Sequence, residues 1–257
     1  MSDGPWIVFT DLDGTLLDAQ TYDCRPASLA LAELAARAIP VVFCTSKTRA
    51  ESEFLQHQIG VSGPLIVESG GAIWIDGEIV VLGLRYAEVL DRFRELKALV
   101  GGAIRGFADL TDAELAQLTG LPPDQAVLAR QREYEEPFFF LHDEEVLAGR
   151  ICSEAEQMGL RVTRGGRFWH LHGPTDKGRA VRHLLQRYPG HRSIGLGDSA
   201  LDLPMLQVAD WAVVVARPDG THDPILQTHL PNSYRTRAPG PFGWTEAIGV
   251  LVFGRAH

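Results

Sequence analysis

The sequence predicts an α/β protein whose core is a doubly wound parallel sheet, with a smaller α+β cap domain inserted into that core. In residues 1–82 and 173–257, short apolar runs alternate with segments of helical pattern, and this alternation is typical of a parallel sheet covered by helices on both faces. Residues 83–172 mix helices and strands without regular alternation. We therefore expect a Rossmann-like core of residues 1–82 and 173–257 and a cap of residues 83–172.

In the first part of the core, apolar runs mark the strands, and longer segments with apolar residues on one side mark the helices. The expected order is strand 6–10, helix 26–38, strand 40–44, helix 48–58 and strand 65–67. Strands 72–75 and 78–82 then flank Asp76-Gly77, and Asp-Gly is a preferred sequence for a tight hairpin turn. This part of the core is therefore expected to end in a hairpin.

The cap and the second part of the core follow from the same signals. The cap is expected to contain helix 86–99, a helix opened by a capping box at Thr111 and Glu114, strand 137–141, helix 144–158, and strands 160–164 and 167–172 around Gly165-Gly166. The core resumes with helix 176–188, for which Thr175 is the expected N-cap. Strands 192–196 and 211–215, with a helix between them, complete the expected elements.

The composition limits the possible classes of function. The chain has 257 residues, of which 45% are hydrophobic and 22% charged, as is usual for a globular protein. Its net charge of −9 argues against nucleic acid or an anionic membrane as partner. No apolar run approaches the roughly 18 residues of a membrane helix, and the first residues show no basic secretory signal. The three scattered cysteines favour reduced thiols, so we expect a cytoplasmic protein.

Two carboxylates directly follow the first expected strand. Asp11 and Asp13 stand two residues apart in Asp11-Leu12-Asp13-Gly14, so one can attack an electrophile while the other transfers protons. Two acids this close repel each other, which favours a divalent cation as a third partner. The same pattern occurs in acidic turns and in calcium loops. A calcium loop, however, needs further oxygen ligands within about a dozen residues, and here a helix follows instead.

This segment resembles the first of four motifs of the haloacid dehalogenase superfamily of phosphotransferases, and the other three follow in order. They are Val41-Val42-Phe43-Cys44-Thr45-Ser46-Lys47, Asp176-Lys177-Gly178, and Gly197-Asp198-Ser199-Ala200-Leu201-Asp202. Asp11, Thr45 and Asp198 each follow an expected parallel strand, where α/β proteins bind their ligands. The resemblance covers both ends of the chain and leaves the middle as an insertion, which in this superfamily is a cap that excludes water and selects the substrate.

The resemblance implies a role for each matched residue. Asp11 would attack phosphorus, and Asp13 would protonate the leaving oxygen and later deprotonate water. Thr45 and the backbone around Ser46 would bind phosphoryl oxygens, and Lys177 would neutralise the reacting groups. Asp198 would complete a Mg²⁺ site with Asp11 and the Asp13 carbonyl, and Asp202 would support this site or bind through water. Only three of the 24 basic residues are lysines, which suggests a need for a compact ammonium at Lys177.

Further segments resemble the mannosyl-3-phosphoglycerate phosphatases. They are Glu68-Ser69-Gly70-Gly71-Ala72-Ile73, Arg130 to Phe138, and Phe168-Trp169-His170-Leu171-His172, with Ser69 where that family more often has Asn. A sugar derivative that carries a phosphate and a carboxylate requires arginine together with acids or amides. The expected substrate-binding residues are therefore Arg132, Glu133, Arg167, His170, Ser69 and Gly70. His170 and His172 should share one face of a strand, but no third ligand makes them a metal site.

These features together predict a Mg²⁺-dependent phosphatase. The resemblance implies that it hydrolyses a small phosphorylated sugar-glycerate through an aspartyl phosphate, with mannosyl-3-phosphoglycerate as the leading substrate and mannosylglycerate, a compatible solute, as product. Alternatives are a phosphatase of another sugar phosphate, a sugar phosphomutase that returns the phosphoryl group to sugar, and a non-catalytic sugar-phosphate sensor. The protein is expected to be a monomer or a homodimer that binds neither nucleic acid nor membrane.

Overall fold

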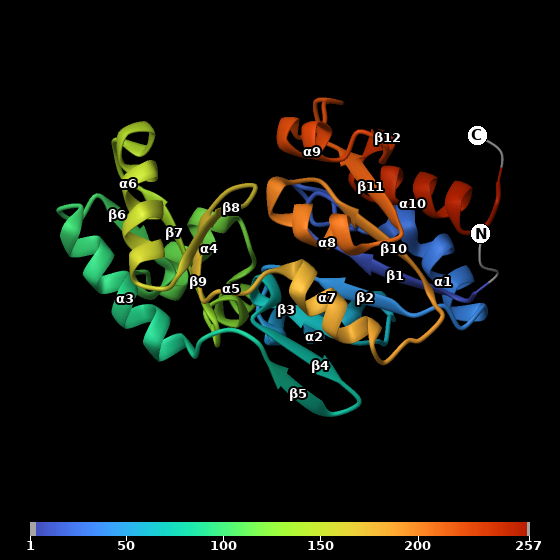
Figure 1. The fold of residues 1–257 in the computed structure, drawn as a ribbon, viewed down its shortest axis with the longest axis horizontal. Helices are drawn as coiled ribbons and strands as arrows, with labels where there is room; N and C mark the ends of the chain where they lie inside the picture. The colour runs from blue at the N-terminus through green and yellow to red at the C-terminus, as the bar shows by residue number, and fades with distance from the viewer. Residues whose placement is uncertain (1–3, 256–257) are drawn as a thin grey trace.

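The computed structural model describes residues 4–255 and contains two sheets, one in each part of the molecule (Figure 1). The larger sheet has eight strands in the order β12-β11-β10-β1-β2-β3-β4-β5. Their bounds are β1 Trp6–Thr10, β2 Val41–Cys44, β3 Leu65–Val67, β4 Ala72–Ile75, β5 Glu78–Val81, β10 Arg192–Gly197, β11 Trp211–Ala216 and β12 Tyr234–Pro239. All neighbours pair in parallel except β3–β4 and β4–β5, so the expected parallel sheet is confirmed.

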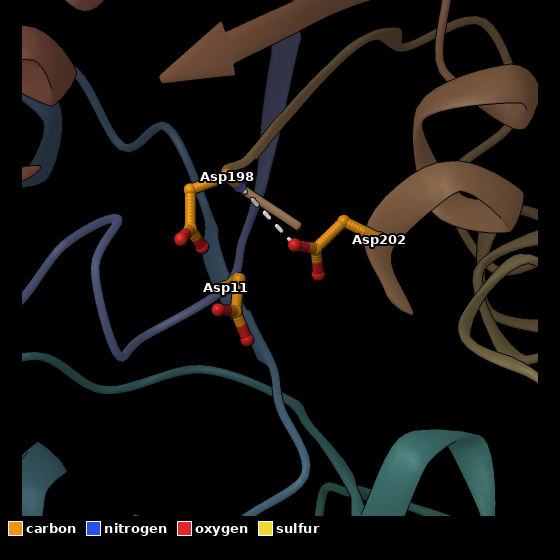
Figure 2. A group of neighbouring side chains, drawn as sticks. All are labelled: Asp11, Asp198 and Asp202. Carbon is orange, nitrogen blue, oxygen red and sulfur yellow. Dashed lines mark hydrogen bonds between the residues drawn. The ribbon is translucent and has the colours of Figure 1, made fainter. Parts of the chain in front are cut away.

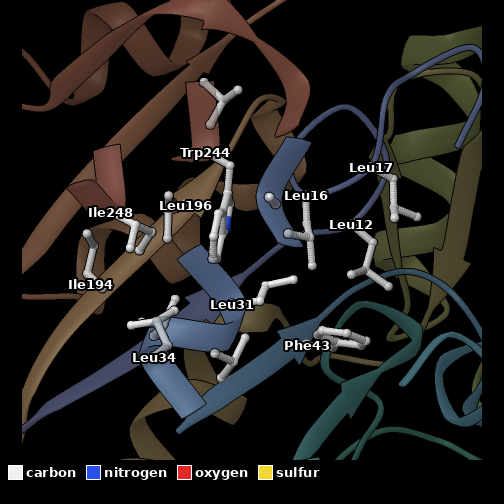
Figure 3. Close-up of a cluster of buried hydrophobic side chains, with 14 of the residues drawn as sticks. Leu12, Leu16, Leu17, Leu31, Leu34, Phe43, Ile194, Leu196, Trp244 and Ile248 are labelled. Carbon is white, nitrogen blue, oxygen red and sulfur yellow. The ribbon is translucent and has the colours of Figure 1, made fainter. Parts of the chain in front are cut away.

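Helices cover both faces of this sheet because its strands alternate their side chains between two apolar clusters. One cluster, drawn in Figure 3, joins Val8 of β1 and Phe43 of β2 to Leu34 of α1 (Ser28–Ala36) and Trp244 of α10 (Gly240–Leu251). The other joins the opposite side of β1 to α7 (Lys177–Leu185), α8 (Leu203–Val208) and α9 (Pro224–His229). Helix α2 (Arg49–Ile59) follows β2. Burial on both faces explains why the central strands β1, β2 and β3 are almost wholly apolar.

The second sheet is antiparallel, with the order β6-β7-β9-β8. It is made of β6 Ile104–Gly106, β7 Glu135–Phe140, β8 Arg161–Arg164 and β9 Trp169–His172, and it is accompanied by α3 Tyr86–Leu99, α4 Asp112–Thr119, α5 Pro123–Ala129 and α6 Glu144–Gln157. An apolar cluster around Phe93, Phe138 and Leu171 joins α3 and α6 to this sheet. We propose residues 83–172 as the cap, because all these elements lie within them.

Several boundaries differ from the sequence expectation. Helix α7 begins at Lys177, and its N-cap is Asp176, whose side chain accepts a hydrogen bond from the Arg179 N–H. The expectation of Thr175 as N-cap was wrong, because its hydroxyl donates to the Gly70 carbonyl instead. Strand β7 begins two residues earlier than expected because the charged side chains of Glu135 and Glu136 are buried with partners. The elements β6, α5, α9, β12 and α10 were not identified, because their sequence patterns are too weak.

Other expectations about local structure are confirmed. Asp76 and Gly77 have φ angles of +52° and +80°, as the tight hairpin turn requires. Thr111 and Glu114 form the expected capping box of α4. The chain passes between core and cap twice, before α3 and after β9. The cap lies beside the large sheet (Figure 1). None of the helices within residues 4–255 has the length and apolar content that a membrane span requires.

Candidate active site

The pairing of β1 with β10 brings two acidic residues together. Thr10 and Leu196 are partners in the parallel register, and the Asp11 N–H donates to the Leu196 carbonyl at 2.9 Å. Asp11 and Asp198 therefore leave neighbouring strands at the same edge of the sheet. Gly14 makes this approach possible, because its φ is +80° and a Cβ there would lie 2.7 Å from an Asp198 carboxylate oxygen.

Asp11, Asp198 and Asp202 form an acidic cluster (Figure 2). One carboxylate oxygen of each lies within 4.8 Å of the others. Burial, reinforced by the negative charge of Asp202, raises the pKa of Asp11 to about 7. Burial and the charges of Asp202 and Asp11 also raise the pKa of Asp198 well above its ordinary value. Such a cluster of oxygen donors is electrostatically unfavourable by itself and suits a hard divalent cation.

Lys177 supplies a positive charge beside this cluster. As the first residue of α7 it is almost fully buried, and its Nζ lies 2.7 Å from Asp11 Oδ1 and 2.6 Å from Asp202 Oδ1. Burial alone would lower the pKa of Lys177, but the carboxylates of Asp11 and Asp202 raise it above its ordinary value. The ammonium therefore stays charged next to the carboxylate that was expected to attack phosphorus.

The second oxygen of Asp202 is also fully engaged. Asp202 Oδ2 accepts hydrogen bonds from the N–H groups of Asp198 and Ser199 and from the Ser199 hydroxyl. Asp198 has one bond to a side chain, from the Thr15 hydroxyl to Oδ1 at 3.1 Å. Asp11 and Asp198 are thus the better available ligands for a cation, while Asp202 orients Lys177 and the Asp198 backbone.

The loop after β2 forms another side of the site. The Thr45 side chain is buried, and its Oγ1 accepts a hydrogen bond from the Lys47 N–H. Lys47 Nζ lies 2.8 Å from Asp13 Oδ2. Asp13 is nearly half exposed, with 45% of its side-chain surface accessible, whereas Asp11 is buried. The two aspartates therefore occupy different environments, as two different chemical roles would require.

A cavity of about 300 Å³ lies over these residues, between the core and the cap. The core contributes Asp11, Asp13, Gly14, Ala19, Tyr22, Ser46, Lys47, Glu51, Asp198, Ser199, Leu201, Arg217 and Pro218. The cap contributes Phe107, Thr119, Leu121, Ala129, Arg132, Pro137, Gly165, Gly166, Arg167, Phe168 and His170. A ligand of this size would lie between polar loops of the core and a wall of the cap that combines apolar side chains with Arg132, Arg167 and His170.

Three of the expected substrate-binding residues line this cavity. Arg132 does so, although its guanidinium already donates to two carbonyl oxygens and to Glu135. Arg167 lies on the β8–β9 turn and donates to the Leu118 and Thr119 carbonyls, at the end of α4. His170 is buried, with its Nδ1 3.0 Å from Glu135 Oε1.

The other three expected substrate-binding residues are not part of the cavity wall. Glu133 faces Arg49 at 3.9 Å. Ser69 and Gly70 are buried in a strained turn, with φ angles of +57° and +92°. A Cβ on Gly70 would lie 2.3 Å from the Asp176 carbonyl. This turn therefore packs beneath the start of α7, which positions Lys177.

The sequence interpretation missed several residues of the cavity. Lys47 is the most important of them, because it contacts Asp13 directly. Its signal was available, since it is one of only three lysines and lies within the second motif. Tyr22 and Arg217 carried no comparable signal, because each follows a core strand in a loop of ordinary polar composition.

Comparisons with known proteins agree with this geometry. Residues 8–93 match the model of the haloacid dehalogenase-like hydrolases. A glucosyl-3-phosphoglycerate/mannosyl-3-phosphoglycerate phosphatase of Methanococcoides burtonii is 38% identical, over 96% of this chain and 97% of its own. A phosphatase of the same name from Persephonella marina is 35% identical, over 94% and 95%.

A solved structure supports the fold. A phosphatase of the haloalkanoate superfamily from Bacteroides thetaiotaomicron superposes with a TM-score of 0.72 at 19% identity, covering 98% of this chain and 96% of that one. The family expected from the four motifs is confirmed by these matches. The chain belongs to the haloacid dehalogenase-like hydrolases and, within them, to the family of the glucosyl-3-phosphoglycerate/mannosyl-3-phosphoglycerate phosphatases.

Proposed function

We propose that this enzyme is a Mg²⁺-dependent phosphatase that acts through an aspartyl phosphate on Asp11. The observation that carries the proposal is the position of Asp11: it lies at the wall of the cavity, 2.7 Å from a buried ammonium and beside Asp198. A carboxylate held in this way can approach phosphorus with its charge balanced. Asp13, more exposed and facing the same cavity, is available for proton transfer.

Two half-reactions follow from this arrangement. In the first, a carboxylate oxygen of Asp11 forms a bond to phosphorus, the bond from phosphorus to the substrate oxygen breaks, and Asp13 donates its proton to that oxygen. In the second, Asp13 takes a proton from water, the water oxygen attacks phosphorus, and the bond to Asp11 breaks to release phosphate. Thr45, the backbone at Ser46 and Lys177 would bind the phosphoryl oxygens during both steps.

The donor set fits magnesium. The available ligands are the carboxylates of Asp11 and Asp198 with the Asp13 carbonyl, all oxygen atoms, while Asp202 is engaged by Lys177 and by backbone N–H groups. A bound Mg²⁺ would neutralise charge on the transferring phosphoryl group. The raised pKa values of Asp11 and Asp198 support the requirement for such a cation.

We propose mannosyl-3-phosphoglycerate as the substrate, with mannosylglycerate as product. The names of the two relatives support this class and add glucosyl-3-phosphoglycerate as a second candidate. Of the three arginines that line the cavity, Arg132 and Arg217 already pair with carboxylates, whereas Arg167 donates to carbonyl oxygens and uses only some of its five N–H groups to do so. It is therefore the arginine best placed to bind a glycerate carboxylate, with His170 near the sugar.

The test measures the free phosphate that the purified protein and its Asp11→Asn variant release. The substrates are both glycosyl-3-phosphoglycerates and a set of free sugar phosphates. We expect release of free phosphate from a glycosyl-3-phosphoglycerate, and less than a few per cent of that rate in the variant, because an amide is not a nucleophile here. Strong activity of Asp11→Asn would remove Asp11 from the mechanism. A preference for free sugar phosphates would reassign the substrate.

A further inference from the structure

Lys47 contacts the acid–base residue of the proposed mechanism. Its Nζ lies 2.8 Å from Asp13 Oδ2, and within residues 4–255 it is the only basic group at ion-pair distance from Asp13. The Lys47 side chain is 9% exposed, whereas that of Asp13 is 45% exposed. A partly exposed carboxylate has several rotamers available. The buried ammonium therefore selects the rotamer in which Asp13 faces the cavity.

Lys47 is itself held from two sides. Glu51 Oε1 lies 3.8 Å from Nζ, and the ring of Tyr22 lies under the ammonium at 5.3 Å. Glu51 is fixed because it forms the capping box at the start of α2, where its carboxylate accepts the Thr48 N–H at 2.9 Å. The ammonium consequently has little freedom to move away from Asp13.

Arg132 of the cap contacts Glu51 and the loop that carries Lys47. Its guanidinium lies 3.6 Å from Glu51 Oε2, and it donates to the Ser46 carbonyl at 2.8 Å. The Arg132 side chain is only 5% exposed. Nearby, the Thr48 hydroxyl donates to the Leu128 carbonyl of the cap at 3.0 Å. The cap is thus docked on the same short segment, residues 46–51, that presents Lys47.

We propose that Lys47 is a positioning residue for Asp13, and that Arg132 of the cap holds Lys47 in place through Glu51 and the Ser46 carbonyl. This inference rests on the proposed function, since it assigns proton transfer to Asp13. It makes the orientation of Asp13 depend on a docked cap. It also gives Arg132 a task other than binding the substrate.

A substrate with a good leaving group isolates this effect. p-Nitrophenolate leaves phosphorus without needing a proton, so transfer to Asp11 does not depend on Asp13. Hydrolysis of the aspartyl phosphate still requires Asp13 to accept a proton from water. A misplaced Asp13 should therefore slow only the second half-reaction, and phosphoenzyme should accumulate.

The experiment compares wild type, Asp13→Asn, Lys47→Met, Lys47→Arg and Lys97→Met by rapid mixing with p-nitrophenyl phosphate and by acid quenching of the phosphoenzyme. Lys97→Met is the matched control, because Lys97 forms a partly exposed pair with Asp109 in the cap. For Lys47→Met we expect a burst close to one p-nitrophenolate per chain. Its steady rate should fall by roughly 10- to 100-fold, as for a catalytic group displaced by about 1 Å. Lys47→Arg should restore most of that rate, and Lys97→Met should behave as wild type.

The outcomes separate the inference from the proposed function. A burst in Asp13→Asn but none in Lys47→Met, with a slower first turnover instead, would overturn the positioning role and place Lys47 on the substrate. The absence of acid-stable phosphoenzyme in every variant, Asp13→Asn included, would count against the aspartyl-phosphate mechanism itself. Circular dichroism at the assay temperature identifies an unfolded Lys47→Met, in which case Lys47→Gln is measured in its place.

The role of Arg132 is tested by the same measurement. Arg132→Met should also accumulate phosphoenzyme, with a smaller loss than Lys47→Met, and the double variant should lose no more than Lys47→Met alone. Independent, multiplying losses would show that Arg132 does not act through Lys47.

Discussion

Lys177→Met removes the only cation that contacts the nucleophile in the described structure, and its effect on stability can be worked out. Lys177 Nζ makes two ionic contacts, 2.7 and 2.6 Å long, and its side chain is 1% exposed. Removing one partner from a buried ion pair costs about 3–5 kcal/mol, because the remaining charge is desolvated and unpaired. We expect a loss of this size in the free energy of unfolding at about pH 7.5 without Mg²⁺.

The loss should depend on pH in a defined direction. Burial and Asp202 already raise the pKa of Asp11 to about 7, and without Lys177 it should rise further. The folded state then holds a proton that the unfolded chain releases above its ordinary carboxyl pKa. The contribution of protonated Asp11 to the stability of Lys177→Met is therefore fully present below the ordinary carboxyl pKa of the unfolded chain. It is lost as the pH rises through the higher pKa of Asp11 in the folded variant. The deficit of the variant should be smaller near pH 5 than near pH 7.5.

Urea unfolding followed by tryptophan fluorescence measures this directly. With a slope of roughly 1–3 kcal/mol per molar urea, the midpoint should move by about 1 M or more. Lys97→Met is again the control, because a partly exposed pair contributes less than about 1 kcal/mol. A deficit below about 1 kcal/mol that does not change with pH would refute the reasoning that Lys177 compensates the buried acids.

The remaining predictions concern the cation, its pH dependence and the cap. Asp198→Ala should raise the Mg²⁺ concentration needed for half-maximal activity by at least about tenfold. Ca²⁺ should restore little activity to enzyme from which the metal has been removed by a chelator. Full activity after chelation would exclude the proposed site. Protons compete with Mg²⁺ for Asp11 below its pKa of about 7. The rise in melting temperature on adding Mg²⁺ should therefore be larger near pH 8 than near pH 5.5. An equal rise at both pH values would place the cation elsewhere. Arg132→Ala should lose similar factors in kcat on p-nitrophenyl phosphate and on a glycosyl-3-phosphoglycerate, because hydrolysis of the phosphoenzyme is common to both substrates and the guanidinium is engaged by Glu51, Glu135 and carbonyl oxygens. A rise in KM of about 100-fold confined to the glycerate substrate would show that Arg132 binds the carboxylate.

The sequence by itself determined the class of fold and the residues at the base of the site. Apolar strands that end in acidic or hydroxyl residues define a parallel sheet, and in such a sheet the carboxyl ends of neighbouring strands meet. For this reason Asp11, Thr45 and Asp198 were expected at one edge of the sheet without knowledge of any distance, whereas Lys177 was assigned from the resemblance of its segment to the third motif. Local signals such as the Asp-Gly turn and the Thr111 capping box were equally reliable, because they depend only on residues a few positions apart.

Only the tertiary structure decided what each long charged side chain contacts. Arg132, Lys47 and Glu51 meet because the cap docks on the loop after β2, over 80 residues away from Arg132 in the chain. No local sequence pattern indicates that contact. Ser69 and Gly70 lie under α7 rather than in the cavity for a similar reason. Partners of buried charges are chosen by how domains pack, because a buried charge is stable only where packing brings an opposite charge or a hydrogen-bond partner to it.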